Sequence, residues 1–401
     1  MKSLEKFMRK LEPTHESKWA KFHPVWDALY TFAFTPGETT SKGAHIRDGI
    51  DLKRTMFTVI VALIPCLLFG IYNTGHWHYI ATGETTAYMD MFGDKVLYGL
   101  MKVLPIVIVS YGVGLGVEFI FCIKNQHAIQ EGFLVSGMLI PLIVPADIPL
   151  WMVAVATVFA VVLGKEVFGG TGMNIVNIAL TARAFLFFGY PTMMSGDKVW
   201  MSGIADVANK PDGVTGATQL GELASFAGPQ EDWVYQGGIK AFESAWSIWD
   251  SFVGMIPGSI GETSTIAIII GAALLLYTGI ASWKIMVSFV IGGLFVGFLS
   301  NAFAVNEYML LDPINHMVIG GFAFGAVFMI TDPVSASQTS TGKYIYGFLG
   351  GALSITIRVF NGAYPEGVMM AILFMNVMAP MIDHYVIQAN IKRRLKRLKT
   401  A

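Results

Sequence analysis

Long apolar runs separated by short polar connections dominate the hydrophobic pattern of this chain. Ten runs are candidates for membrane-spanning or re-entrant helices, at 56–72, 103–122, 132–144, 150–163, 175–188, 265–281, 285–304, 317–330, 344–357 and 368–382. Several of them, notably the third and the fifth, are shorter than the ~20 residues that a complete helical crossing needs. Their Pro and Gly boundaries predict broken helices, with candidate breaks at 169–172 and 331–335.

The composition supports a lipid environment. Of the 401 residues, 54% are hydrophobic and only 14% are charged, whereas an ordinary soluble domain carries roughly 25% charged residues. A globule with so few charges could not cover its surface with polar groups, so much of that surface must face lipid. We therefore expect an all-α integral membrane protein of about ten transmembrane helices. The net charge of −1 argues against nucleic acid binding.

The basic residues predict the orientation in the membrane, because cytoplasmic loops are enriched in Lys and Arg. If the N-terminus is inside, ten spans place 20 basic residues on the cytoplasmic side and four outside. Both termini are then cytoplasmic. The first 54 residues lack the pattern of a cleavable signal peptide. The two cysteines, Cys66 and Cys122, have no paired spacing, which excludes iron–sulfur or zinc sites made from cysteines of this chain alone.

A polar stretch at 189–262 separates the first five spans from the last five. It carries three lysines against nine acids, which fits an external loop. Because each half has an odd number of spans, two homologous halves would be inverted repeats, as in many transporters. The expected organisation is a cytoplasmic arm, a first repeat, a periplasmic insert, a second repeat and a basic cytoplasmic tail, at 1–55, 56–188, 189–262, 263–386 and 387–401.

The insert contains the short motif Thr215-Gly216-Ala217-Thr218. Asp-Gly and Thr-Gly pairs in this stretch are common in turns, so one interpretation is an ordinary turn. The other is that Thr218 offers an accessible hydroxyl, preceded by small residues that leave room for an enzyme or a phosphate.

A glycine-rich stretch at 164–177 ends in Asn174 and Asn177. It lacks the Gly-Lys-Ser/Thr ending of a phosphate-binding loop, and it could simply be a flexible connection. If the stretch is helical, however, the spacing of three places both amides on one face. Two amides at membrane depth need partners, and a heteroaromatic ring system would supply them.

Ionisable residues within or beside membrane spans are costly and are candidates for function. Four stand out: Glu118, Arg183, Asp332 and Asp383. Carboxylate oxygens suit sodium or proton sites, whereas the alternative is a salt bridge or a side chain that reaches the membrane interface. The basic tail at 392–399 is interpreted as a topology signal that also attracts anionic lipid.

Taken together, these motifs resemble the B subunits of the bacterial sodium-translocating NADH:quinone oxidoreductases. The likeness covers nearly the whole chain. It rests on matches in order at 47–54, 131–133, 165–172, 184–188, 257–262, 331–337, 364–367 and 388–394.

The resemblance implies roles for nine residues. Thr218 would carry FMN through a phosphoester that a flavin transferase installs, with Thr215 standing where serine is frequent. Asn174 and Asn177 would bind riboflavin, although Met173 and Ile178 depart from the family pattern beside them. The resemblance places the quinone pocket at Gly114, Glu131 and Phe133, and sodium uptake or coupling at Glu118, Asp332 and Asp383.

The implied activity is electron transfer from NADH to ubiquinone coupled to outward sodium pumping. It requires five partner subunits, A, C, D, E and F, in the bacterial inner membrane, and the chain alone would be inactive. Two alternatives remain open at this point. One is the D subunit of the related ferredoxin:NAD complex, and the other is a non-redox transporter with two inverted repeats.

Overall fold

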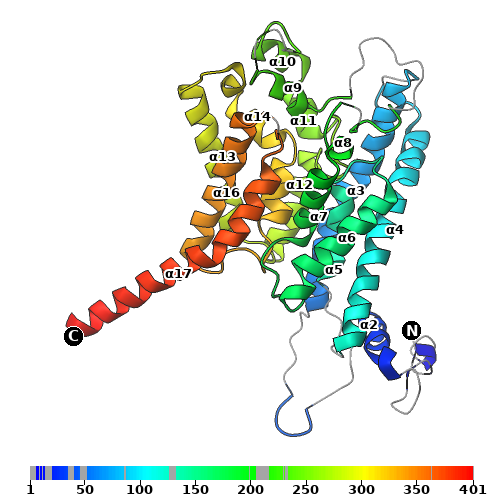
Figure 1. Cartoon of the computed structure of the whole chain (residues 1–401), viewed down its shortest axis with the longest axis vertical. Coiled ribbons are helices and arrows are strands. Elements are labelled where there is room, and N and C mark those ends of the chain that lie inside the picture. Colours follow the sequence, from blue (N-terminus) through cyan, green and yellow to red (C-terminus); the bar gives the residue numbers. More distant parts are fainter. Residues whose placement is uncertain are drawn as a thin grey trace.

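The computed structural model in Figure 1 describes a bundle of helices and, within the part it describes, no strand. The described residues are 6–8, 10, 12–13, 20–34, 40–45, 52–84, 87–125, 132–197, 199–204, 216–228, 230, 234–362 and 364–400. A short helical segment precedes the bundle, consisting of η1 (Ala20–Phe22) and α2 (His23–Ala33).

Five helices precede the polar insert: α3 (Leu52–Ala81), α4 (Phe92–Asn125), α5 (Phe133–Leu142), α6 (Leu150–Gly164) and α7 (Ile178–Gly189). The second half contains α12 (Thr265–Tyr277), α13 (Trp283–Ala302), α14 (Pro313–Val318), α15 (Phe322–Phe324) with the π-helical turn η5 (Gly325–Met329), α16 (Ser340–Phe360) and α17 (Val368–Thr400). Short helices fill the connections, namely η2 (Glu166–Phe168), α8 (Pro191–Met194), α9 (Gln219–Ser225), α10 (Ile239–Ala245), α11 (Ile248–Val253) and η4 (Glu307–Leu310).

Five of the described helical segments are long and apolar enough to cross a membrane: those of α3, α4, α6, α13 and α17. Helices α5, α7 and α12 are apolar but shorter. The predicted fold class, an all-α membrane protein, is therefore confirmed. The number of ten crossings stays a prediction, because the shorter helices do not reach the length of a complete span on their own.

The two halves share part of their packing order, although α3 packs against α4 whereas α12 has no comparable contact with α13. In the first half α4 packs against α3, α5 and α6, and α6 packs against α7. In the second half α13 packs against α14 and α16, and α16 packs against α17, so the second and fourth long elements are neighbours in both halves. Helices α3 and α12 join the halves. The organisation into two five-helix repeats stays a prediction.

Both halves contain an interrupted helix. Helix α5 has only ten residues, about 15 Å at 1.5 Å per residue, and its chain continues without regular structure to Leu150. The apolar run at 317–330 was predicted as a single span, but it is broken at Ile319–Gly321, where Gly320 has a φ of +67° that favours glycine. The predicted breaks at 169–172 and 331–335 are also non-helical.

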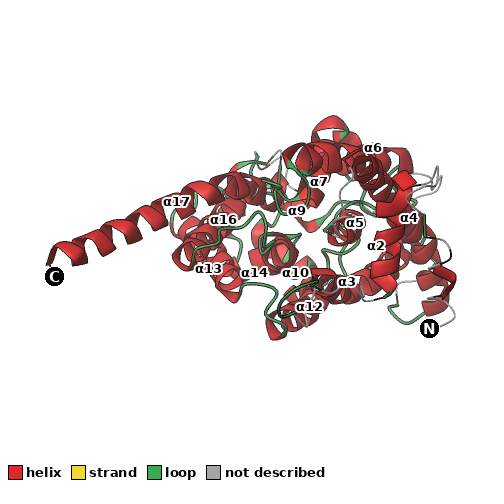
Figure 2. Ribbon diagram, turned by 90° about the horizontal axis from the view of Figure 1, so that it is seen from below, coloured by secondary structure: helices red, strands yellow, loops and turns green. Residues whose placement is uncertain are grey.

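The insert lies at one end of the bundle, where α9 and α10 are seen in Figure 1, and we call this the insert end. Both chain termini lie toward the opposite end, which we call the terminal end. Beyond the bundle α17 extends outward, as Figure 2 shows. The insert is not an isolated domain, because its apolar core, formed by residues such as Leu223, Phe226 and Phe242, includes Tyr308 and Ile319 of the second half.

Close helix packing depends on glycine where α13 meets α16. A Cβ atom added at Gly351 would overlap the carbonyl oxygen of Phe289. We expect Gly351→Ala to force these helices apart and to lower the free energy of unfolding by about 1–3 kcal/mol, the usual cost of overpacking. The measurement is the melting temperature of the detergent-purified protein.

Gly112→Ala is the matched control, because this exposed glycine of α4 has no heavy atom within 4 Å of an added Cβ. Its melting temperature should be unchanged or slightly higher, since alanine favours the helix. Equal melting temperatures for the two variants would show that the contact of α13 with α16 does not require glycine.

Candidate functional site

Thr218 occupies the N-cap of α9, where its hydroxyl oxygen accepts a hydrogen bond from the backbone N–H of Gly221 at 3.1 Å. The side chain is half-buried and lines two cavities at the insert end. Trp200 and Glu366 line both cavities as well. The second has a volume of about 220 Å³ and also includes Asp197 and Tyr364. Thr218 is thus an accessible hydroxyl beside preformed space.

A buried ion cluster lies next to these cavities. Arg183 of α7 donates from Nη1 to Glu262 Oε1 at 2.7 Å and from Nη2 to a carboxylate oxygen of Glu366. The hydroxyl of Ser259 donates to the other oxygen of Glu262 at 2.6 Å. Because Arg183 belongs to the first half, Glu262 to the end of the insert and Glu366 to the second half, the cluster fastens these three parts together. The sequence identified Arg183 as a charge that is costly to bury within a span, but no spacing indicated that Glu262 and Glu366 would be its partners.

At the terminal end, Asn174 and Asn177 line a cavity of about 90 Å³ together with Asp332. The expectation that one helical turn would hold both amides is wrong, because both residues precede α7. Asn177 caps that helix by accepting from the N–H of Leu180 at 3.2 Å, and Asn174 Nδ2 donates to the carbonyl of Val176 at 3.2 Å. Both side chains are buried. The cavity still brings residues of the two halves together.

Of the residues assigned to the quinone pocket, Gly114 and Phe133 are in direct contact. A Cβ atom added at Gly114 would overlap the ring of Phe133, which is fully buried. The neighbouring residue Gly132 lines the cavity of the two asparagines. Glu131 lies outside the described residues.

Glu118 forms a buried ion pair with Lys165, and the two side chains are only 3% and 2% exposed. The lysine comes from the connection between α6 and η2. In the sequence, Lys165 is simply one residue of the glycine-rich stretch at 164–177, and nothing there indicates an ion pair. Because 47 residues separate the partners, no local pattern could have paired them.

Asp383 of α17 is held by four hydrogen bonds from residues 337–339, which immediately precede α16. The hydroxyls of Ser337 and Thr339 donate to it at 2.7 and 2.6 Å, and the backbone N–H groups of Gln338 and Thr339 donate at 2.7 and 3.0 Å. Asp332 instead accepts from the N–H of Val334 at 3.1 Å and the hydroxyl of Ser335 at 3.0 Å. Of these two acids, only Asp332 lines the asparagine cavity.

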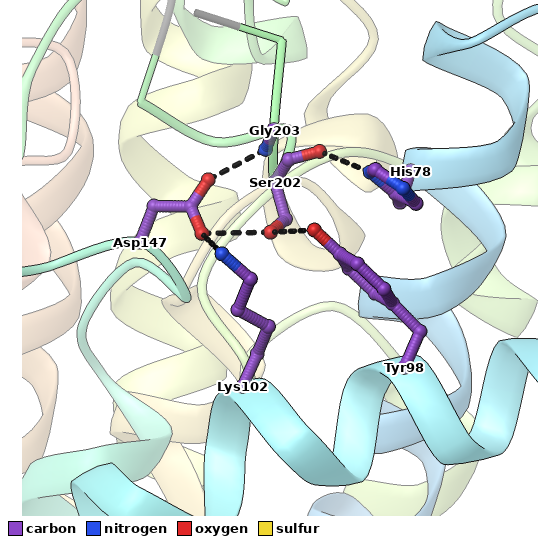
Figure 3. Close-up of polar contacts among 6 residues, drawn as sticks. All are labelled: His78, Tyr98, Lys102, Asp147, Ser202 and Gly203. Carbon is purple, nitrogen blue, oxygen red and sulfur yellow. Dashed lines mark hydrogen bonds and ion pairs between the residues drawn. The ribbon is translucent and has the colours of Figure 1, made fainter. Parts of the chain in front are cut away.

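A further polar cluster, which the sequence did not predict, fixes the start of the insert (Figure 3). Asp147 accepts from Lys102 Nζ and the hydroxyl of Ser202, both at 2.7 Å, and from the N–H of Gly203 at 2.6 Å. Burial alone would raise the pKa of Asp147, but these three hydrogen bonds hold it below its usual value. Tyr98 adds a hydrogen bond to Ser202 at 3.1 Å.

In the insert, the pKa of Glu222 shifts in the opposite direction to that of Asp147. Burial raises the pKa of Glu222 above its usual value, against the opposing hydrogen bonds from Trp246 and Tyr235. Among the described residues, no group of three or more His, Cys, Asp or Glu side chains is arranged to hold a metal ion.

These features define a multi-pass helical membrane protein with two broken segments and candidate sites at opposite ends of its bundle. The sequence profile of the NQR2, RnfD, RnfE family matches residues 39–392, and the chain belongs to this family.

Several similar proteins are named as the B subunit of a Na(+)-translocating NADH-quinone reductase. The protein of Chromohalobacter salexigens is 46% identical, over 97% of this chain and 95% of its own length. That of Stutzerimonas stutzeri is 45% identical over 98% of each chain, and that of Pseudomonas aeruginosa is 43% identical over 95% of each.

The contribution of the ion pair between Glu118 and Lys165 to the stability of the fold can be tested by substitution. We expect Glu118→Gln to leave the buried lysine charge with only its longer contact to Glu166, at 4.0 Å. The free energy of unfolding should fall by about 3 kcal/mol, the lower end of the usual cost of breaking a buried ion pair. The double variant Glu118→Gln with Lys165→Met should recover most of this loss. The melting temperatures of the three purified proteins measure the effect.

Lys102→Met is the control, because it breaks a more exposed pair with Asp147, for which the usual loss is about 1 kcal/mol or less. A double variant as unstable as Glu118→Gln alone would show that the buried lysine charge is not the cause.

Proposed function

We propose that the chain is the B subunit of a sodium-translocating NADH:quinone oxidoreductase, the activity that the names of its relatives state for those proteins. The observation that carries this proposal is the placement of Thr218 beside two cavities at one end of the bundle, with the cavity that Asn174 and Asn177 line at the other. A chain that relays electrons between two faces of a membrane needs a site near each face.

Thr218 is proposed to hold FMN through a phosphoester. The fit is supported by a half-buried hydroxyl that opens on cavity space, and by the aromatic side chains of Trp200, Phe187 and Tyr364 in the larger cavity. Aromatic faces suit a flat ring system. When bound, flavin supplies the electron-transfer chemistry, and the chain supplies position and electrostatics.

The asparagine cavity is proposed to hold riboflavin. Its lining is mostly apolar, with residues such as Val135, Leu139 and Phe328, and the amides of Asn174 and Asn177 are the polar groups expected to orient a ring. Gly114, Glu131 and Phe133 are proposed for the quinone pocket. The cavity reaches Gly132, which lies next to Phe133, so a quinone bound there would be near the riboflavin site.

For sodium, we propose different roles for the three acids. Asp332 lines the cavity and is expected to meet the ion, as a hard oxygen ligand. The carboxylate of Glu118 is paired with Lys165, and that of Asp383 accepts hydrogen bonds from the residues just before α16. These two acids would therefore act by fixing the connections before η2 and α16, and not as ligands of the ion. The ion route is expected to pass between the two halves.

The proposed assembly contains subunits A, C, D, E and F, which would bring electrons from NADH, and a flavin transferase would modify Thr218 before or during assembly. The chain would lie in the bacterial inner membrane with both termini cytoplasmic. This orientation agrees with the placement of both termini toward one end of the bundle. Alone, the chain is expected to be inactive.

The first test is covalent flavin on Thr218. The chain, produced in a host that has the flavin transferase, should fluoresce as a flavin protein after denaturing electrophoresis, and peptide mass mapping should find FMN on Thr218. Thr218→Val should abolish the fluorescence because it removes the acceptor oxygen, whereas Thr215→Val should keep it. Fluorescence that persists in Thr218→Val would refute the assignment.

The same preparation separates the alternatives. A D subunit of the ferredoxin:NAD complex would also carry flavin but would copurify with ferredoxin-dependent partners and not with an NADH:quinone reductase. Absence of flavin from the unsubstituted chain would favour the non-redox transporter. The family profile covers both redox complexes by its description, so flavin alone does not decide between them.

The second test concerns sodium. In the assembled complex, Asp332→Asn should raise several-fold the sodium concentration needed for half-maximal quinone reduction, because it removes a charged ligand from the cavity. Asp383→Asn, whose site is a set of hydrogen bonds, should change thermal stability more than sodium dependence. An unchanged sodium response in Asp332→Asn would remove this residue from the ion path.

A further inference from the structure

A cavity of about 490 Å³ lies at the insert end, between α4, the connection from α5 to α6, and α8. The proposed function assigns it no role. Its lining is mostly apolar, with residues such as Pro105 and Ile106. Other lining side chains also face outward, because Met101 is 60% exposed and Leu150 and Met193 are exposed as well. The cavity is therefore a groove on the outside of the bundle, which we call the α4–α8 groove.

The groove lies where the bundle crosses the edge of the apolar core of a membrane. The apolar segment of α6 begins at Leu150, which lines the groove. Helix α4 has 34 residues, about 51 Å, so it extends beyond a hydrocarbon core of ~30 Å. Trp151 is exposed beside Leu150 and meets Tyr190 edge to face, with ring centroids 5.5 Å apart. Such aromatic side chains are enriched where a membrane meets water.

The polar part of the groove is the ion pair of Lys102 and Asp147, whose Nζ and Oδ1 atoms are 2.7 Å apart (Figure 3). The two side chains remain 37% and 31% exposed, so the pair is not enclosed. Asp147 accepts three hydrogen bonds, from Lys102, Ser202 and Gly203, whereas an ionised carboxylate offers about four acceptor positions. An ammonium has three N–H donors, and Asp147 takes one of them. The pair can therefore still bind one acceptor and one donor.

This remaining capacity matches a zwitterionic lipid headgroup. A phosphate accepts hydrogen bonds and suits Lys102, and a primary ammonium donates hydrogen bonds and suits Asp147. An ethanolamine headgroup carries both groups. A choline headgroup carries the same charges but lacks an N–H donor, and a glycerol headgroup has hydroxyl donors but no positive charge. Because the ion pair is neutral as a whole, a neutral headgroup leaves no charge uncompensated.

We propose that the α4–α8 groove binds one phospholipid of the ethanolamine class, with its phosphate on Lys102, its ammonium on Asp147 and an acyl chain along the apolar lining. The inference does not depend on the proposed function. A lipid fits better than a protein segment because apolar space at the depth of the membrane core adjoins a half-exposed charge pair at its edge. The volume is also within the range of roughly 300–1,000 Å³ of ordinary ligand pockets.

The bound lipid would have a structural effect. Asp147 joins α4 to the segment at 202–203, which belongs to the start of the insert. A headgroup that binds both members of the ion pair would strengthen this connection, and any ligand that binds only the folded state raises its stability. We therefore expect phosphatidylethanolamine to raise the melting temperature of the purified chain.

The test is native mass spectrometry of the full chain, purified in mild detergent, stripped of lipid and titrated with phosphatidylethanolamine, phosphatidylcholine or phosphatidylglycerol of identical acyl chains. One phosphatidylethanolamine should bind per chain, about tenfold more tightly than either other lipid, because only it supplies a charged donor to Asp147. Equal affinities for the three lipids would overturn the proposal. This titration needs no substitution and decides the question even if a variant does not fold.

Two variants locate the site. Lys102→Met removes the donor to the phosphate and should weaken the binding of phosphatidylethanolamine about tenfold. Ala146→Phe adds bulk to the apolar lining but leaves the ion pair intact, and it should weaken the binding of all three lipids.

Lys284→Met is the matched control. Like Lys102, this half-buried lysine bonds to a neighbouring side chain, Ser340, and its Nζ lies over a tyrosine ring, 5.8 Å from the centroid of Tyr344. It does not line the groove. The control should keep the affinity of the unsubstituted chain. Equal losses in Lys102→Met and Lys284→Met would overturn the proposal, because they would show a general effect of losing a lysine.

Cross-linking in the complete complex tests the other possible occupant. A photoreactive amino acid in place of Met193, which lines the groove, should form adducts with phospholipid. Adducts with another subunit and none with phospholipid would overturn the proposal, because the groove would then be a contact between proteins.

Discussion

Inside a bilayer, each backbone group that an interrupted helix leaves unpaired must find a partner within the protein. This constraint explains the position of Arg358, one of the most buried charges among the described residues. Arg358, which is fully buried, donates to the carbonyl oxygens of His316 at 2.7 Å and Ile319 at 3.2 Å, where α14 ends. A guanidinium suits this place because it carries several donors in a fixed plane and keeps its charge.

At the other interrupted helix, α5, a backbone group and not a side chain pairs with the free carbonyl oxygen. At the end of α5, the carbonyl oxygen of Leu142 accepts from the N–H of Gly261 at 2.7 Å, so the last segment of the insert supplies the missing partner. That segment carries Glu262, which binds Arg183. The repair of a broken helix and the joining of the two halves are therefore achieved by the same few residues, directly beside the cavities of Thr218.

Much of the fold could be predicted, because hydropathy and charge act along the chain and need no knowledge of tertiary contacts. The apolar runs indicated the helices, and the polar insert marked the division into halves. The break at Gly320 was missed because the run at 317–330 is apolar throughout, and the glycines within it fit a membrane helix equally well. The side chain that pairs with the carbonyl groups freed at the break is Arg358, 38 positions after Gly320 in the sequence.

The candidate sites could be predicted only in part for the same reason. A motif identifies a residue type, whereas its role depends on which side chains meet it from elsewhere. Thr218 and Asn177 both turn out to be helix caps, although the asparagine pair was expected on a helix face. Lys165 is recognised as important only from its ion pair with Glu118, and Tyr364 only from the cavity that it lines. Both the ion pair and the cavity are formed by the fold.

The acids show how tertiary context divides residues that sequence reasoning treats alike. Glu118, Asp332 and Asp383 were grouped because carboxylates near apolar spans are costly. In the folded chain, Lys165 forms an ion pair with Glu118, and Asp383 accepts four hydrogen bonds from the residues just before α16. Asp332 accepts two hydrogen bonds within its own turn and also lines a cavity. A carboxylate that borders open space can exchange its partner for an ion at lower cost than one enclosed by fixed donors, so the cavity, and not the charge alone, singles out Asp332.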